Sequence, residues 1–319
     1  MKLSNIRDIL AVAETGSLRS ASRKIGITQP TITRSIRDAE NELGLELFKR
    51  TVSGAVPTDL GRIFIRRAKV IQNELRKIQE DLAQARGELT GEVSIAMSPA
   101  ACIALLPSAL RNFEARFPHA TLKLTETLLE PVEQELLSGS IDFYVGPFAK
   151  EITTTALHVE KLFDNRRVIV GRKGHPLATS TNLEMMRDAR WVRPSLLGRR
   201  DEVEFAAIFE RAGLPPPEIA VQASSAIMTL LTVANSDLLS IFPAQWVELS
   251  EQILGVEVIP FPEPLTAPAI HLVRRGGLPL TPLGEAFYDM VHKAALNYRL
   301  RLPSAATHLI QQPEGQTSG

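Results

Sequence analysis

Residues 16–50 read GSLRSASRKIGITQPTITRSIRDAENELGLELFKR, and this stretch decides the fold of the N-terminal part. The segment 18–25 places apolar residues three and four positions apart, which is the spacing of one helical face. Thr28 precedes a second periodic segment and can cap it, while Pro30 stands where a missing N–H costs nothing. Two helices joined by a short turn at residues 26–28 predict a helix-turn-helix, whose second helix enters the major groove of DNA.

The second segment separates an apolar stripe from a polar and basic face. The stripe contains Ile32, Ile36, either Ala39 or Glu40, and Leu43. The opposite face would meet base edges and phosphates. The alternative interpretation is an ordinary helical hairpin with a solvated face. The candidate DNA-binding residues in this segment are Thr28, Gln29, Pro30, Thr31, Thr33, Arg34 and Arg37.

A possible wing follows the second helix. Val52 and Val56 flank Gly54, and this pattern predicts a small hairpin over residues 46–57. Side chains on such a hairpin would contact phosphate or the minor groove. The alternative is a plain surface turn. The candidate DNA contacts here are Lys49, Arg50 and Ser53.

Residues 58–86 predict one long helix, with Thr58 as its cap and Asp59 near its positive end. Apolar residues recur at alternating spacings of four and three, which is a heptad seam flanked by polar side chains. We therefore expect a partner helix from a second copy of the chain. Such a dimer would present two recognition helices to half-sites about one helical turn apart, or a multiple of that. The seam consists of Phe64, Ala68, Ile71, Leu75, Ile78, Leu82 and Ala85.

Charge is distributed unevenly along the 319 residues. The whole chain has 36 basic and 36 acidic residues, but residues 1–86 contain 16 basic against 10 acidic ones. A basic front end and an acidic remainder suit a protein that meets phosphate only through its front end. The single cysteine, Cys102, excludes an internal disulfide and fits a reducing cytoplasm. We expect no signal peptide and no membrane span, because residues 1–15 are charged and no apolar run approaches the required length.

The period changes after a hinge bracketed by Gly87 and Gly91. Strand and helix patterns then alternate, which predicts a mostly parallel sheet covered on both faces. The tail 303–319 lacks an apolar period, and we expect it to be disordered. The expected strands are 92–97, 121–125, 141–145, 167–171, 191–193, 219–221, 238–242, 257–260 and 269–274. The expected helices are 99–117, 130–137, 182–187, 202–212, 225–235 and 281–298.

The N-terminal run resembles the signature of the LysR-type transcriptional regulators over about sixty residues. Thr28 and Thr33 stand where family members often have Ser, and both keep the hydroxyl group. Ser22 and Ala39 stand where Ala and Leu are frequent. The matching residues are Gly16, Ser17, Leu18, Ala21, Thr28, Gln29, Pro30, Ile32, Thr33, Ile36, Glu40, Leu43, Gly44, Leu47, Phe48, Arg50, Thr58 and Gly61.

The resemblance implies an α+β protein: a winged helix-turn-helix with a long linker helix, then a two-lobed α/β effector domain like a periplasmic binding protein. It also implies a regulator that binds double-stranded promoter DNA, forms a homodimer or homotetramer, and contacts RNA polymerase. The implied parts are a DNA-binding domain at 1–58, a linker helix and hinge at 59–91, lobe one at 92–162 and 268–302, lobe two at 163–267, and the tail.

An effector site is expected where strands end and helices begin, because free amides and the helix dipole favour an anion there. Each serine at such a place could instead be a simple helix cap, and each apolar candidate could be core packing. The resemblance places the segments at 98–100 and 224–225 where family members bind carboxylates or similar anions. A small organic anion, such as an aromatic carboxylate or sulfonate, would suit. The candidates are Ser98, Pro99 and Ala100; Ser224 and Ser225; Ser195, Arg199 and Arg200; and, as walls, Leu129, Phe148 and Phe242.

Catalytic motifs are not visible in the sequence. The six histidines show no metal-ligand spacing, and the sequence has no Gly-x-Ser-x-Gly, phosphate-loop or dinucleotide-binding pattern. We therefore expect no enzyme activity, catalytic residue, metal or cofactor. The alternative is an α/β enzyme that acts on a small anion and uses its N-terminal helices for oligomerisation; it would need a nucleophile–base pair.

Overall fold

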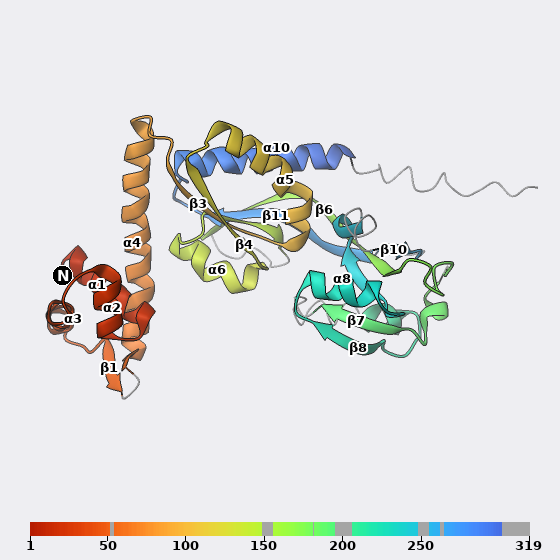
Figure 1. The fold of residues 1–319 in the computed structure, drawn as a ribbon, viewed down its shortest axis with the longest axis horizontal. Helices are drawn as coiled ribbons and strands as arrows, with labels where there is room; N and C mark the ends of the chain where they lie inside the picture. The colour runs from red at the N-terminus through yellow and green to blue at the C-terminus, as the bar shows by residue number, and fades with distance from the viewer. Residues whose placement is uncertain are drawn as a thin grey trace, which may run out of the picture.

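The computed structural model describes residues 1–51, 54–148, 156–180, 182–194, 206–247, 255–261 and 265–301. A small helical domain lies against the first part of the long helix α4 (Asp59–Ala85), one α/β lobe lies beside the rest of the helix, and a second α/β lobe lies further away (Figure 1). This arrangement confirms the expected fold class. No helix in the described ranges has both the length and the apolar character needed to cross a bilayer. The expected disordered tail, 303–319, lies outside the described residues.

The N-terminal domain contains the predicted helix-turn-helix. The helices α1 (Leu3–Thr15), α2 (Leu18–Ile25) and α3 (Gln29–Leu43) enclose a shared apolar core. The Thr28 hydroxyl accepts a hydrogen bond from the Thr31 amide, which confirms the predicted cap. Gly26 has a left-handed φ of 70°, and this lets the chain turn directly from α2 towards α3. Strands β1 (Phe48–Thr51) and β2 (Gly54–Pro57) pair antiparallel, so the predicted hairpin is confirmed.

Helix α4 begins at its predicted cap, Thr58, and packs closely on the hairpin. A Cβ at Gly61 would lie 2.0 Å from the Leu47 carbonyl oxygen, so only glycine allows this approach. The seam prediction was wrong for the front of the helix. Phe64 and Ala68 pack within their own domain, because α1 crosses this part of α4. The later seam residues Ile71, Ile78 and Leu82 remain 41%, 53% and 54% exposed.

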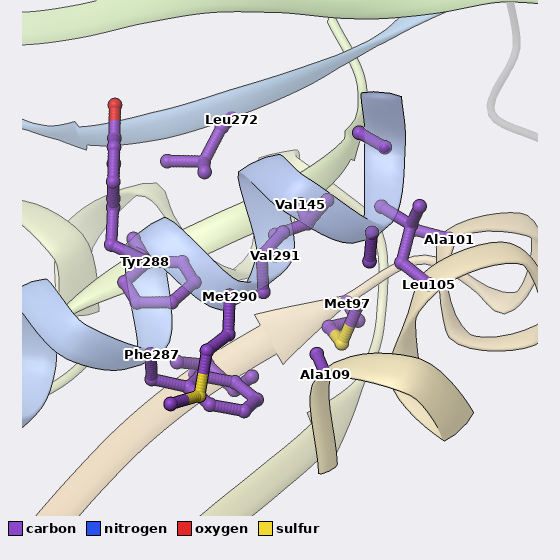
Figure 2. Close-up of a cluster of buried hydrophobic side chains, with 14 of the residues drawn as sticks. Met97, Ala101, Leu105, Ala109, Val145, Leu272, Phe287, Tyr288, Met290 and Val291 are labelled. Carbon is purple, nitrogen blue, oxygen red and sulfur yellow. The ribbon is translucent and has the colours of Figure 1, made fainter. Parts of the chain in front are cut away.

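Lobe one consists of β3 (Gly91–Met97), α5 (Pro99–Arg116), β4 (Ala120–Glu126), α6 (Leu129–Ser138), β5 (Phe143–Pro147) and α10 (Pro282–Arg301). Strand β3 runs parallel to both β4 and β5. Helices α5 and α10 pack together over the sheet and bury one large apolar core. Figure 2 shows Phe287 and Val291 of α10 in this core, with Leu105 of α5 and Met97 of β3.

Two long strands cross between the lobes. Strands β6 (Leu157–Arg172) and β11 (Leu265–Arg275) pair antiparallel, and β11 also pairs antiparallel with β5. The expectation of a mostly parallel sheet was therefore wrong: the chain leaves lobe one along β6 and returns along β11, so the two neighbouring strands must run in opposite directions. The register between them shifts between Ala267 and Ile270, which are the residues at the expected lobe boundary.

Lobe two extends from the far end of these crossing strands. Its elements are the 3₁₀ turn η1 (Leu183–Met186), β7 (Arg190–Pro194), an α-helix at 206–211, β8 (Glu218–Ala223), α8 (Ala226–Ala234), β9 (Ser240–Pro243), the 3₁₀ turn η2 (Ala244–Trp246) and β10 (Val256–Ile259). Strands β7 and β8 are parallel, while β9 and β10 both pair antiparallel with β6. The expected helix at 182–187 is only the η1 turn, and the one at 202–212 is described from 206 onwards.

A polar interface fixes α4 to lobe one. The Lys77 ammonium lies 2.8 Å from the Asp142 carboxylate, and these side chains are only 10% and 4% exposed. Asp142 also accepts a hydrogen bond from the Ser94 amide at 2.8 Å. Strand β5 begins at Phe143, directly after Asp142, rather than at the expected residue 141. The Asn73 amide adds two hydrogen bonds of 2.9 Å, to the Ser138 carbonyl and the Ser140 hydroxyl.

We expect Asp142→Asn to lower the free energy of unfolding by about 3 kcal/mol, because it leaves the Lys77 ammonium buried without its counter-charge. Urea denaturation of the full chain measures this. The matched control is Glu184→Gln, which breaks the exposed pair with Arg187 and should change stability by less than about 0.5 kcal/mol. Equal losses in both variants would show that the buried pair does not hold the interface.

Candidate DNA interface and effector site

The candidate DNA-binding residues of α3 lie mostly on one exposed face. Gln29, Pro30, Thr31, Arg34 and Arg37 are all exposed, on the side of the helix opposite the buried Ile32 and Ile36. The Arg34 side chain is 86% exposed and reaches only a distant partner, the Asp38 carboxylate at 4.0 Å. Such an exposed pair holds a guanidinium weakly. Arg34 is therefore available to a phosphate or a base edge.

Two concave surfaces meet on this face. One, of about 580 Å³, lies between α3 and the hairpin and includes Lys49. The other, of about 540 Å³, follows the first turns of α3 and includes Gln29 and Arg34. Thr33 and Arg37 line both surfaces. The structure thus brings the α3 candidates and Lys49 together along one face. Ser53 lies outside the described residues, as does the side chain of Arg50.

Glu40 positions the hairpin relative to α3, a role that the sequence analysis missed. Its carboxylate oxygen accepts hydrogen bonds from the Leu47 amide at 2.7 Å and the Phe48 amide at 3.2 Å. Leu47 directly precedes β1 and Phe48 begins it, so the Glu40 side chain joins α3 directly to the β1–β2 hairpin. The available signal was a carboxylate at a position of the apolar stripe, since a half-buried charge needs hydrogen-bond donors.

The hairpin is also held from its other sides. The Ala55 amide donates to the Gly16 carbonyl at 2.8 Å, at the turn between α1 and α2. Gly54 makes this approach possible, because a Cβ there would lie 2.3 Å from the same carbonyl oxygen. The Thr58 hydroxyl donates to the Glu46 carbonyl at 2.7 Å. Helix α3 and the wing therefore form one rigid surface with fixed spacing.

Two of the candidate effector serines cap helices. Ser98 is 1% exposed, and its hydroxyl accepts a hydrogen bond from the Ala101 amide at 3.3 Å at the start of α5. Ser225 caps α8 by accepting from the Met228 amide at 3.2 Å. Ser224 is exposed beside it. Both serines therefore act as helix caps, and each follows the carboxyl end of a strand, β3 for Ser98 and β8 for Ser225. A shared ligand cleft for these serines stays a prediction.

The remaining effector candidates divide into core residues and residues that the structure leaves undescribed. Phe148 is buried near Tyr144 and lies 5.8 Å, ring to ring, from His271. Phe242 is buried in a different core, 6.0 Å from the Trp246 ring. Both pack in the interior, and a wall role for them stays a prediction. Pro99 and Ala100 form the first turn of α5. Ser195, Arg199, Arg200 and the side chain of Leu129 lie outside the description.

Cys102 lies in α5 close to Ser98, and its surroundings disfavour the thiolate. Burial, with a smaller contribution from the charge of Glu126, raises the pKa of the Cys102 thiol to about 11. The thiol therefore stays protonated at neutral pH, and a protonated thiol is a poor nucleophile. In the part of the chain that the structure describes, no three His, Cys, Asp or Glu side chains gather as a metal site would require.

Two family models match the chain. Residues 3–62 match the bacterial regulatory helix-turn-helix protein, lysR family, and residues 86–296 match the LysR substrate binding domain. Curated relatives include the HTH-type transcriptional regulator GalR of Pseudomonas putida, 29% identical over 88% of this chain and 71% of GalR. Another is the HTH-type transcriptional regulator AlsR of Bacillus subtilis, 31% identical over 68% of this chain and 72% of AlsR.

Solved structures share the fold. The crystal structure of CbnR, a LysR family transcriptional regulator, has a TM-score of 0.64 at 23% identity and covers 92% of this chain and 99% of CbnR. Full-length CbnR complexed with its target DNA gives the same TM-score and identity, over 92% of this chain and all of that one.

We expect Glu40→Ala to weaken binding of duplex DNA about tenfold, because two wing amides lose a charged acceptor and the wing loses its fixed place beside α3. Fluorescence anisotropy with a labelled promoter fragment measures this. Glu42→Ala removes the same charge from the same helix, but the described structure pairs Glu42 with the N-terminal amine and not with the hairpin. An equal loss in the two variants would assign the effect to charge alone.

Proposed function

Because the chain belongs to the LysR family of transcriptional regulators, we propose that α3 and the wing read promoter DNA while the two lobes sense a small organic anion. The chain is a DNA-binding regulator and not an enzyme, as its curated relatives are named transcriptional regulators. The observation that carries the residue-level proposal is the shared face on which Thr33, Arg37 and Lys49 lie together.

DNA recognition divides between the two elements of this face. Gln29 and Thr31 stand in the first turn of α3, where a recognition helix meets base edges. Arg34 and Arg37 lie further along the same exposed side and carry the charge that phosphates or guanine edges attract. Lys49 extends the cationic surface onto the wing, where it would contact the backbone.

A second copy of the chain would complete the DNA-binding unit. The exposed apolar residues Ile71, Ile78 and Leu82 recur along one face of α4 at spacings of seven and four. A parallel or antiparallel partner helix would remove them from water, which is the main driving force for association. We propose that two such dimers pair into a homotetramer and that this assembly contacts RNA polymerase. It would act in the cytoplasm, where a bacterium keeps its promoter DNA.

The effector site that we propose lies between the helix starts that Ser98 and Ser225 cap. At each start, free amides and the positive end of the helix favour a carboxylate or a sulfonate. Ser224 stands exposed beside the second cap. Arg199 and Arg200 would add positive charge. This arrangement supports an anion with an apolar or aromatic body.

Closure of the two lobes would change DNA binding by moving lobe one and the helix attached to it. The register irregularity between β6 and β11 is the place where the two crossing strands can bend. Helix α4 is attached to lobe one through Lys77 and Asn73, so a rotation of lobe one moves α4 with it. Such a rotation would change the separation of the two recognition helices in a dimer and thereby the bending of the promoter.

We expect the full chain to bind the intergenic fragment upstream of its own gene with steep salt dependence, and Arg34→Ala to weaken this binding about tenfold or more. Anisotropy titrations at several salt concentrations measure both. The control is Arg299→Ala, which removes an exposed charge from the far end of α10. DNA binding that is unchanged in Arg34→Ala would remove α3 from the interface.

For the effector, a thermal-shift screen of aromatic and aliphatic acids and sulfonates should yield an anion that raises the melting temperature, because it binds only the folded state. We expect Ser98→Ala to weaken that ligand about tenfold. The control is Asn182→Ala, which removes another cap, at η1, outside the proposed cleft. A ligand shift that survives intact in Ser98→Ala would exclude Ser98 from the site.

A further inference from the structure

A pocket of about 330 Å³ lies in lobe one, at the end of β11 and the start of α10. Arg274 and Arg275 line it, together with His158 at the start of β6. Leu278 and Pro279 add an apolar wall, and the Glu285 carboxylate also lines the pocket, so an anion would compete with it for Arg274. In the β11–β5 pairing, Arg274 lies opposite Phe143 at the beginning of β5. The Ser98 amide donates a hydrogen bond to the carbonyl of Val145, which lies further along β5. The pocket is therefore separate from the proposed cleft.

The guanidinium of Arg274 is incompletely satisfied. Its shortest described carboxylate contact, to Glu285, is long at 3.4 Å. Its Nε atom is buried without a hydrogen-bond partner among the described residues. The guanidinium carbon lies 5.3 Å from the centre of the Tyr288 ring, so the ring covers one side of the group, while the Arg274 side chain remains 26% exposed. An oxyanion at the exposed part of the guanidinium would replace the long contact to Glu285 with a charge-assisted hydrogen bond.

Arg275 connects this pocket to the linker helix. Its guanidinium forms an ion pair with the carboxylate of Glu74, which belongs to α4. It also donates to the Leu137 carbonyl at the long distance of 3.4 Å. Because planar guanidinium forks bind carboxylates and phosphates alike, an oxyanion in the pocket competes with Glu74 for the same group.

From this geometry we infer that the pocket is a second anion site, which takes a small oxyanion of the carboxylate or phosphate class and competes with Glu74 for Arg275. Arg274 supplies a guanidinium whose described carboxylate contact is long, and Arg275 supplies one that Glu74 now holds. The apolar wall gives room for a short aliphatic chain. Occupancy weakens one of the contacts that hold α4 to lobe one, so this site acts on the DNA-binding end independently of the cleft.

Isothermal titration of the full chain with succinate and with inorganic phosphate, at constant ionic strength set with sodium chloride, tests the inference. At least one of the two anions should bind. Arg274→Gln should weaken that anion tenfold or more, whereas Lys293→Gln, an exposed charge loss elsewhere on α10, should leave it unchanged. A response to succinate alone or to phosphate alone identifies the preferred class, and a response to neither overturns the inference.

Glu74→Gln provides the sharper variant, because it keeps every pocket group and removes only the competitor. We expect it to tighten the anion severalfold, a change that general damage to the fold would not produce. This variant decides the matter even if Arg274→Gln fails to fold. Unchanged or weaker binding in Glu74→Gln would overturn the competition, and loss of binding in Ser98→Ala would assign the anion to the cleft instead.

Discussion

The attachment of α4 to lobe one sets how the N-terminal domain and the lobes are placed relative to each other. Lys77 and Asp142 form a buried pair whose charges satisfy each other, and Asp142 also holds the Ser94 amide. Burying two charges is expensive unless both partners stay in place, so the pair allows one position of α4 on the lobe and disfavours others. The DNA-binding domain, which packs on the front of the same helix, thereby takes its orientation from the effector domain.

This attachment gives α4 two faces with different roles. The face that bears Lys77 and Asn73 is occupied by the chain's own lobe, whereas Ile78 and Leu82 point to solvent. A stripe of exposed large apolar side chains on a long helix is typical of an interaction surface. One proposed anion site lies between the two lobes, and the other lies beside the contact between Arg275 and Glu74. Both would act by moving α4 rather than by touching the DNA-binding domain.

Local features were predictable from sequence because short-range chemistry determines them. The caps at Thr28 and Thr58 and the hairpin around Gly54 depend on residues within a few positions of each other. Pairings between distant segments were not predictable. Parallel and antiparallel strands show the same alternation of apolar residues, so the sequence did not predict the antiparallel pairing of β6 with β11. Nothing near Lys77 points to Asp142, and the heptad pattern cannot tell whether α1 or a second chain covers Phe64. The candidate cleft depends on how the two lobes are positioned relative to each other, and no local sequence pattern predicts that position.

In the proposed dimer, the exposed stripe of α4 joins two copies so that two recognition helices bind DNA together. Sedimentation of the full chain and of Ile78→Glu, each followed by titration with the promoter fragment, tests this most directly. Gln72→Glu, which places the same charge about 120° around the helix, is the control. We predict that the wild type and the control sediment as dimers or tetramers, and that Ile78→Glu sediments as a folded monomer with DNA binding at least tenfold weaker. A wild-type chain that is monomeric and binds DNA as tightly as Ile78→Glu would rule out the proposed dimer.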